Sequence, residues 1–230
     1  MGDGKEMINI LYEDNHLLCV EKPYNIPVQA DDSNDEDLLT ILKKYLKETY
    51  QKPGNVYLGL VHRLDRPVGG VMVFAKTSKA ASRLSKSMQE DEVKKEYLAI
   101  LDGVPDKKED TLEDYLYKDT NTNTVSVSTK ENGKYAKLDY DVIASKDNKT
   151  LVHILLHTGR SHQIRVQFSS RNLPLVYDQR YNPNTTKGQI ALYAYQLTFP
   201  HPTTKEEICI TSLPRIEKPW DIFEEYICQK

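Results

Sequence analysis

The sequence is poor in cysteine and has no long hydrophobic run. Its three cysteines, Cys19, Cys209 and Cys228, are odd in number and too far apart for a CxxC zinc or redox pair. A disulfide-built secreted domain is therefore not expected, and free thiols suit a reducing compartment. No stretch approaches the ~18 apolar residues of a membrane helix, and the chain does not start with a charged segment followed by an apolar one. These absences exclude a membrane protein and favour the cytoplasm.

An excess of positive charge is also missing. The formal net charge of -3 at pH 7 argues against a protein that coats nucleic acid by bulk electrostatics. The charge is unevenly distributed, because Asp65 is the only acid among the arginines and lysines of residues 62–86, and residues 151–177 contain no acid. Acids gather instead at 31–39, 109–119 and 221–226. An acidic chain of this kind can still carry a positive cleft.

The length and composition predict one substantial domain. The chain has 230 residues, of which 39% are hydrophobic, enough to fill a sizeable core. It contains no internal repeat, no low-complexity segment and no linker long enough to divide it. We therefore expect a single domain over residues 1–230, preceded only by a loose tail over residues 1–7.

Strand and helix patterns alternate irregularly along the chain. Within 8–23, a turn at Asp14 and Asn15 separates two predicted strands. Further segments rich in β-branched and aromatic residues predict strands at 71–76, 95–103, 123–129, 136–145, 150–158, 188–202 and 206–212. Apolar spacings of three and four predict helices at 35–50, 78–90, 161–172 and 219–227, with Ser78 capping the second and Ser161 beginning the third. Many strands with few helices, outside a regular βαβ series, indicate an α+β fold.

The stretch VHRLDRPVGGVMVFAK at 61–76 places Asp65 between Arg63 and Arg66. A structural salt bridge is the ordinary interpretation of such an acid. Pro67 and the two glycines that follow set a rigid bend and let the backbone pass close to another group, before an apolar strand anchors the segment. This arrangement is typical of a loop residue presented at a cleft by a rigid sheet.

Three motifs in this order resemble those of RluA-type pseudouridine synthases. HRLDRPVGGVMVFAK at 62–76 is similar to the catalytic segment of that family, KKEYLAILDG at 94–103 to its Lys-x-Tyr element, and TGRSHQIRVQF at 158–168 to its Gly-Arg-x-His-Gln-Ile-Arg element. Weaker elements match at 173–181 and 199–204. Gly69, Gln167 and Tyr177 depart from the family pattern, where Ser, His and Gly are usual.

The resemblance implies an α+β catalytic domain with a mixed, mainly antiparallel central sheet flanked by helices. It also implies that a uridine in RNA is isomerised to pseudouridine. A carboxylate on the sugar face can stabilise positive charge, attack C1′ or remove a sugar proton. Since such an enzyme must reach a stacked base, it has to flip the nucleotide out of the RNA.

Site residues follow from the resemblance. Asp65 is then the catalytic carboxylate, Arg165 the guanidinium that keeps it ionised, and Tyr97 the ring that stacks on the uracil. Ile164 closes the other side of the base, and Arg63 either occupies the space that the flipped base leaves or holds the flipped backbone. His62, Arg66 and His162 complete the expected substrate-binding set. Without the family, Tyr97 is expected to be a core strand residue and His62 to make a structural hydrogen bond. Ile164 fits a helix core residue equally well, and Arg165 a phosphate or surface contact equally well.

No metal, cofactor or membrane contact is expected. His153 and His157 would lie about 13 Å apart along a strand, too far to share one ion, and no carboxylate or cysteine lies beside them or beside His162 in the sequence. The expected partner is ribosomal or transfer RNA, and the protein is expected to be a monomer. A separate N-terminal RNA-binding domain is not expected, because the first strand begins near Ile8. A catalytically silent RNA-binding module and a hydrolytic glycosidase remain as alternatives, although a glycosidase should show a second carboxylate.

Overall fold

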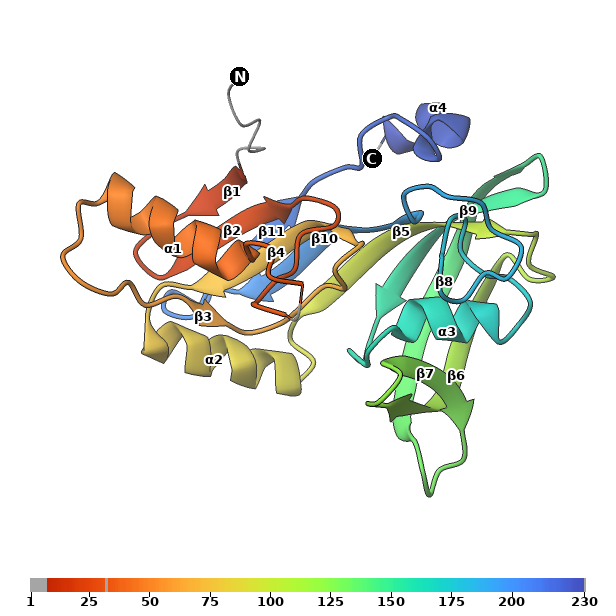
Figure 1. The fold of residues 1–230 in the computed structure, drawn as a ribbon, viewed down its shortest axis with the longest axis horizontal. Coiled ribbons are helices and arrows are strands. Elements are labelled where there is room, and N and C mark those ends of the chain that lie inside the picture. The colour runs from red at the N-terminus through yellow and green to blue at the C-terminus, as the bar shows by residue number, and fades with distance from the viewer. Residues whose placement is uncertain (1–7, 32, 230) are drawn as a thin grey trace. The chain divides into compact units, whose positions relative to one another are not determined.

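The computed structural model describes residues 8–31 and 33–229, so the tail predicted over 1–7 lies outside the described residues. The chain divides into two compact units, each built from two chain segments (Figure 1). The first unit takes its described residues from Met1–Val93 and Gln196–Ser212, and the second from Lys94–Tyr195 and Leu213–Lys230. The single domain expected over 1–230 stays a prediction. Within the described ranges, no helix is both long and apolar enough to cross a membrane.

The first unit is built around antiparallel strands. They are β1 (Asn9–Glu13), β2 (Leu17–Lys22), β3 (Gly59–Leu60), β4 (Gly69–Ala75), β11 (Glu207–Thr211) and the part of β10 (Leu192–Pro200) that starts at Gln196. β2 pairs with both β1 and β4, β3 pairs with β4, and β11 pairs with β10. The predicted turn between the first two strands is confirmed, since the Asp14 carboxylate accepts hydrogen bonds of 2.7 Å from the backbone N–H groups of His16 and Leu17.

Two helices complete the first unit, α1 (Leu38–Thr49) and α2 (Ser78–Gln89). Asp37 caps α1 by accepting from the N–H of Thr40 at 3.0 Å. The cap predicted at Ser78 is wrong by one residue. Thr77 has an extended backbone, and its side chain accepts from the N–H of Ala80 at 3.1 Å, which leaves Ser78 as the first helical residue.

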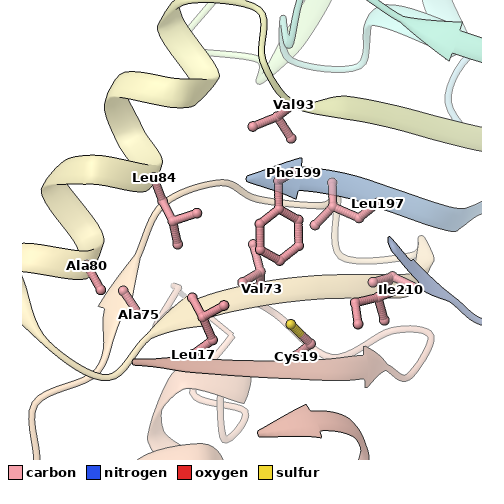
Figure 2. Close-up of a cluster of buried hydrophobic side chains, with 11 residues drawn as sticks. Leu17, Cys19, Val73, Ala75, Ala80, Leu84, Val93, Leu197, Phe199 and Ile210 are labelled. Atoms are coloured by element: carbon pink, nitrogen blue, oxygen red, sulfur yellow. The ribbon is translucent and has the colours of Figure 1, made fainter. Parts of the chain in front are cut away.

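A hydrophobic cluster holds α2 against the strands of the first unit. Figure 2 shows Leu84 of α2, Val73 of β4 and Phe199 of β10 pointing into the same cluster, each at most 1% exposed. α2 also packs along β3 and β4. Because both ends of β4 are fixed by pairing and by this cluster, the loop that enters β4 starts from a rigid base.

The second unit contains an antiparallel sheet in the order β5-β9-β8-β6-β7. Its strands are β5 (Lys94–Asp102), β6 (Glu109–Asp119), β7 (Thr124–Ser128), β8 (Lys134–Lys146) and β9 (Lys149–Leu156). β6 was not predicted from the sequence, where residues 109–119 stood out only as a cluster of acids. Leu112 and Leu116 are buried, and the position between them on the same face of the strand is Asp114, so the alternation of apolar and polar residues typical of a strand is interrupted.

Short helices complete the second unit: α3 (Gln163–Ser169), the 3₁₀ turn η1 (Trp220–Phe223) and α4 (Glu224–Ile227). The helix predicted to begin at Ser161 begins two residues later. His162 adopts a left-handed φ of 52°, which is incompatible with the helix and makes this residue its N-cap. The helix predicted over 219–227 is confirmed only as the two short pieces η1 and α4. The α+β class with a mainly antiparallel sheet and flanking helices is confirmed.

Candidate functional site

The predicted catalytic loop lies in the first unit, between β3 and β4. Its apolar residues Leu64 and Val68 are 8% and 2% exposed and anchor it, whereas Asp65 between them is half-buried. The Val68 N–H donates to the Asp65 carbonyl at 2.9 Å and closes a four-residue turn. The loop therefore holds a carboxylate on a short, internally bonded turn.

His62 ties the start of this loop to the sheet. The backbone N–H of Val73 in β4 donates to His62 Nε2 at 3.1 Å, so this ring nitrogen accepts and carries no proton. The expected structural hydrogen bond is present. A role for the rest of the ring toward substrate stays a proposal.

Arg66 is held by the acidic segment that precedes α1. Its Nε donates to the Asn25 carbonyl at 3.1 Å, its Nη1 lies 3.4 Å from Asp31, and its Nη2 is bonded to Asp35. Asp31 and Asp35 thus neutralise an arginine beside Asp65. Arg63, on the other side of Asp65, is exposed.

A residue that the sequence analysis missed lies under the same loop. Lys22 at the end of β2 is fully buried, and its ammonium donates to the carbonyls of Pro23, Arg66 and Val68 at 3.0, 2.9 and 2.7 Å. The only signal in the sequence was a lysine at the end of an apolar strand, directly before a proline. Most such lysines are exposed.

Arg165 lies in the second unit, in the first turn of α3, and it forms a buried ion pair. Its Nε and Nη2 donate to the two carboxylate oxygens of Asp178 at 2.8 and 2.7 Å, and the side chains are 6% and 0% exposed. Burial would raise the pKa of Asp178. The hydrogen bonds and charge of Arg165, with the N–H groups of Arg180 and Tyr181, hold that pKa below its usual range instead.

Aromatic contacts fix the same arginine from another side. The Arg165 guanidinium lies over the Tyr181 ring, 5.1 Å from its centre, in a cation–π arrangement. The Tyr181 hydroxyl accepts from the N–H of Val125 at 2.9 Å and hydrogen-bonds to His162 Nδ1 at 2.7 Å. The structure therefore brings His162, Arg165 and Asp178 together around Tyr181, a residue that the sequence analysis did not single out.

The remaining predicted site residues of this unit are buried. Tyr97 on β5 is 8% exposed and pairs with Ile154 of β9, and Ile164 in the first turn of α3 is 4% exposed. This burial is compatible with both interpretations of Tyr97 and Ile164, as core residues and as residues that contact the base. His62, Arg63, Asp65 and Arg66 belong to the first unit, whereas Tyr97, His162, Ile164 and Arg165 belong to the second.

The departures from the family pattern have local structural explanations. Gln167 is fully buried, and its amide donates to the Leu112 carbonyl at 3.1 Å and to Asp114 at 2.8 Å, so it bonds α3 to β6. Tyr177 adopts a left-handed φ of 58°, where glycine is usual. A Cβ added at Gly188 would come within 2.6 Å of the Tyr177 ring, so the glycine at 188 makes room for it. Gly69 is the buried first residue of β4.

Carboxylates that are distant in the sequence lie beside the strand histidines in the structure. His153 lies between Asp141 and Glu96, with its nitrogens 2.7 and 2.8 Å from their oxygens, and His157 Nε2 lies 2.6 Å from Asp139. These acids come from neighbouring strands, which the sequence alone did not align. Across residues 8–31 and 33–229, no group of three or more His, Cys, Asp or Glu side chains is placed to hold a metal ion.

Comparisons with known proteins point to one family. The family model described as RNA pseudouridylate synthase matches residues 16–170. The ribosomal large subunit pseudouridine synthase C of Buchnera aphidicola subsp. Baizongia pistaciae is 31% identical over 213 residues, which cover 88% of this chain and 66% of the relative. The ribosomal large subunit pseudouridine synthase D of Nitrosomonas europaea is 34% identical over 206 residues, 85% of this chain and 58% of the relative.

A solved structure agrees with these sequence relatives. The human RNA pseudouridylate synthase domain containing 1 superposes with a TM-score of 0.74 at 25% identity, and the match covers 96% of this chain and 90% of that one. The chain spans about two thirds of the length of the first curated relative and less of the second.

Proposed function

Because this chain belongs to the RNA pseudouridylate synthase family, we propose that it isomerises uridine in RNA to pseudouridine. The RluA-type resemblance of its motifs is confirmed by the family match and by the relatives. The observation that carries the proposal is the ordered turn of Asp65, placed between Arg63 and Arg66 in the family's catalytic segment. A silent RNA-binding module of the same fold would not need this carboxylate.

The reaction breaks one bond to the sugar and makes another. The N1–C1′ bond breaks with its electron pair on the uracil, the base turns, and C5 bonds to C1′. The C5 proton then leaves and N1 takes up a proton, so uridine and product are isomers. Asp65 acts at the ribose, either by attacking C1′ or by removing a sugar proton. Uridine and pseudouridine are at the same oxidation level, so the reaction needs no oxidant or reductant.

The other site residues take the roles that the resemblance implies. By the resemblance, Arg165 supplies positive charge that keeps Asp65 ionised. Within its own unit the Arg165 guanidinium is held by its buried pair with Asp178. Tyr97 stacks on the uracil and assists the proton transfer at C5. Ile164 contacts the other face of the base.

The remaining residues bind the RNA strand. Arg63 is exposed and holds the flipped nucleotide, an event that costs a few kcal/mol and is offset by phosphate and stacking contacts. Arg66 binds a phosphate of the RNA after it releases its ion pair with Asp31 or Asp35. His62 and His162 position the strand from their two loops. The protein acts as a cytoplasmic monomer, and large-subunit ribosomal RNA is the first substrate to test, with transfer RNA second.

A transcript labelled with tritium at C5 of uridine tests the proposal. Formation of the C5–C1′ bond expels the label, so tritium release should equal the pseudouridine formed, with no free uracil. Free uracil would instead show a glycosidase, and binding without release of label would show a silent module. Either result would overturn the proposed function.

A further inference from the structure

Tyr181 joins several parts of the second unit through one side chain. Its hydroxyl accepts from the backbone N–H of Val125 in β7 at 2.9 Å and lies 2.7 Å from Nδ1 of His162. Its ring lies beneath the Arg165 guanidinium and packs against a small cluster of buried aliphatic residues from β6, β7, β8 and α3. Its carbonyl accepts from the Ser169 hydroxyl at 2.7 Å. Packing and backbone bonding therefore fix the place of the hydroxyl.

The contact with Val125 indicates which way the hydrogen bond between Tyr181 and His162 runs. A phenol hydroxyl has one proton to donate, and the Val125 N–H already occupies an acceptor position on its oxygen. Burial raises the pKa of Tyr181, so the hydroxyl keeps its proton at neutral pH. Donation to Nδ1 of His162 satisfies that proton on a half-buried side chain. This arrangement favours Nδ1 as the acceptor of the imidazole.

The position of the imidazole proton follows from this direction. A neutral imidazole has one donor and one acceptor nitrogen, and the bond at one nitrogen decides which tautomer is present. If Nδ1 of His162 accepts from Tyr181, the ring carries its proton on Nε2 and can donate from there. The other tautomer, with a proton on Nδ1, would take this acceptor away from the Tyr181 hydroxyl. Tyr181 therefore selects the donor atom of His162.

The backbone of His162 supports a role beyond starting the helix. Its left-handed φ of 52° is uncommon for a residue other than glycine. As the N-cap of α3 it makes no side-chain hydrogen bond to the first turn, so its ring does not serve as a cap. Such backbone conformations persist where the surrounding structure determines them, and they cluster at ligand-binding sites. The stretch around His162, residues 151–177, contains no acid, which suits an anionic ligand.

We propose that Tyr181 is a positioning residue that keeps the proton of His162 on Nε2, so that His162 donates a hydrogen bond to a phosphate oxygen of the bound RNA. The Val125 N–H orients the hydroxyl, the hydroxyl orients the imidazole, and the imidazole N–H binds the phosphate. This inference rests on the proposed function, because the donor needs an RNA strand to receive its hydrogen bond. Tyr181 acts through His162 and does not itself touch the RNA.

The test compares wild type with Tyr181→Phe, which removes the hydroxyl and keeps the ring beneath Arg165. KM for RNA should rise by about 3- to 10-fold, the contribution of one neutral hydrogen bond, while kcat changes by less than about twofold. In a His162→Ala background the same substitution should have no further effect on KM. Tyr140→Phe is the matched control. It removes the hydroxyl of another buried tyrosine of this unit, bonded to the Lys107 carbonyl at 3.4 Å, and should leave both constants unchanged.

Nitrogen NMR of the His162 ring tests the inference in the intact protein, without any variant. At about pH 8, above the ordinary imidazole pKa of about 6.5, Nδ1 should give the signal of an unprotonated nitrogen and Nε2 that of an N–H. Binding of RNA should shift the Nε2 signal. A proton on Nδ1 in the wild type, or KM losses of Tyr181→Phe and His162→Ala that simply add, would overturn the inference. If the wild type made no pseudouridine, the proposed function would fail, while the NMR signals would still identify the tautomer.

Discussion

The buried pair of Arg165 and Asp178 predicts a large loss of stability for Arg165→Met. Both side chains are almost inaccessible to water, and two hydrogen bonds of 2.8 and 2.7 Å join them. Removing one partner leaves a buried charge uncompensated, which typically costs about 3–5 kcal/mol. Arg171→Met is the matched control in the same unit. Its pair with Asp114 is 33% and 12% exposed, and such a partly solvated pair contributes about 1 kcal/mol or less.

Urea unfolding of the single variants and of the double variant Arg165→Met/Asp178→Asn measures this effect. Asparagine removes the orphaned charge while keeping an oxygen for the N–H groups of Arg180 and Tyr181, which donate to Asp178 at 3.0 and 3.2 Å. The double variant should therefore be more stable than Arg165→Met, with a coupling of about 1–3 kcal/mol. Strictly additive losses would refute the reasoning.

The stability difference between wild type and Arg165→Met should also depend on pH. The pKa of Asp178 is lowered in the folded protein, so the carboxylate contributes stability above its unfolded pKa of about 3.9 and loses it as the pH falls through the folded value. Without Arg165, burial should raise the pKa of the Asp178 carboxyl above the unfolded value. The deficit of Arg165→Met should therefore be full above that raised value and shrink as the pH falls from there through the lowered wild-type value. A deficit that stays constant down to acid pH would mean that Asp178 is not the charge left behind.

Two further predictions concern packing and RNA. Gly188→Ala should destabilise the protein by about 1–3 kcal/mol, because its Cβ would meet the Tyr177 ring at 2.6 Å. In thermal unfolding, the double variant Gly188→Ala/Tyr177→Gly should recover most of this loss. An equal loss in the single and the double variant would exclude the contact. Affinity for RNA should fall linearly on a log–log plot against salt, with a shallower slope for Arg63→Ala than for wild type. A binding constant that does not respond to salt would argue against phosphate contacts.

Local patterns predicted the elements of the first unit well, because the signals there are local. The turn at Asp14, the stripe of Leu38, Leu42 and Leu46, and the apolar strand after the two glycines all appear within one segment of chain. The missed β6 is the opposite case. The burial of this strand depends on α3 and β8, which pack on it from elsewhere in the sequence, and its Asp114 is bonded to Gln167 and Arg171.

The partners of the charged residues could not be predicted, because they come from distant positions. Arg165 stood out by its motif, but its pairing with Asp178 requires the loop after α3 to fold back. The acids beside His153 depend on the strand register that places Asp141 opposite it. The burial of Lys22 follows from the path of the loop over β2, which no local pattern encodes.

Turnover of RNA by Asp65→Asn tests the central claim most directly. The variant keeps the size of the side chain, so the fold and the RNA affinity should match wild type, while pseudouridine formation should become undetectable. Asp91→Asn, at an exposed turn position with φ of 56°, is the control and should keep full activity. Pseudouridine formation by Asp65→Asn within about tenfold of wild type, a difference of only about 1.4 kcal/mol in the barrier, would contradict the assignment of Asp65 as the catalytic carboxylate.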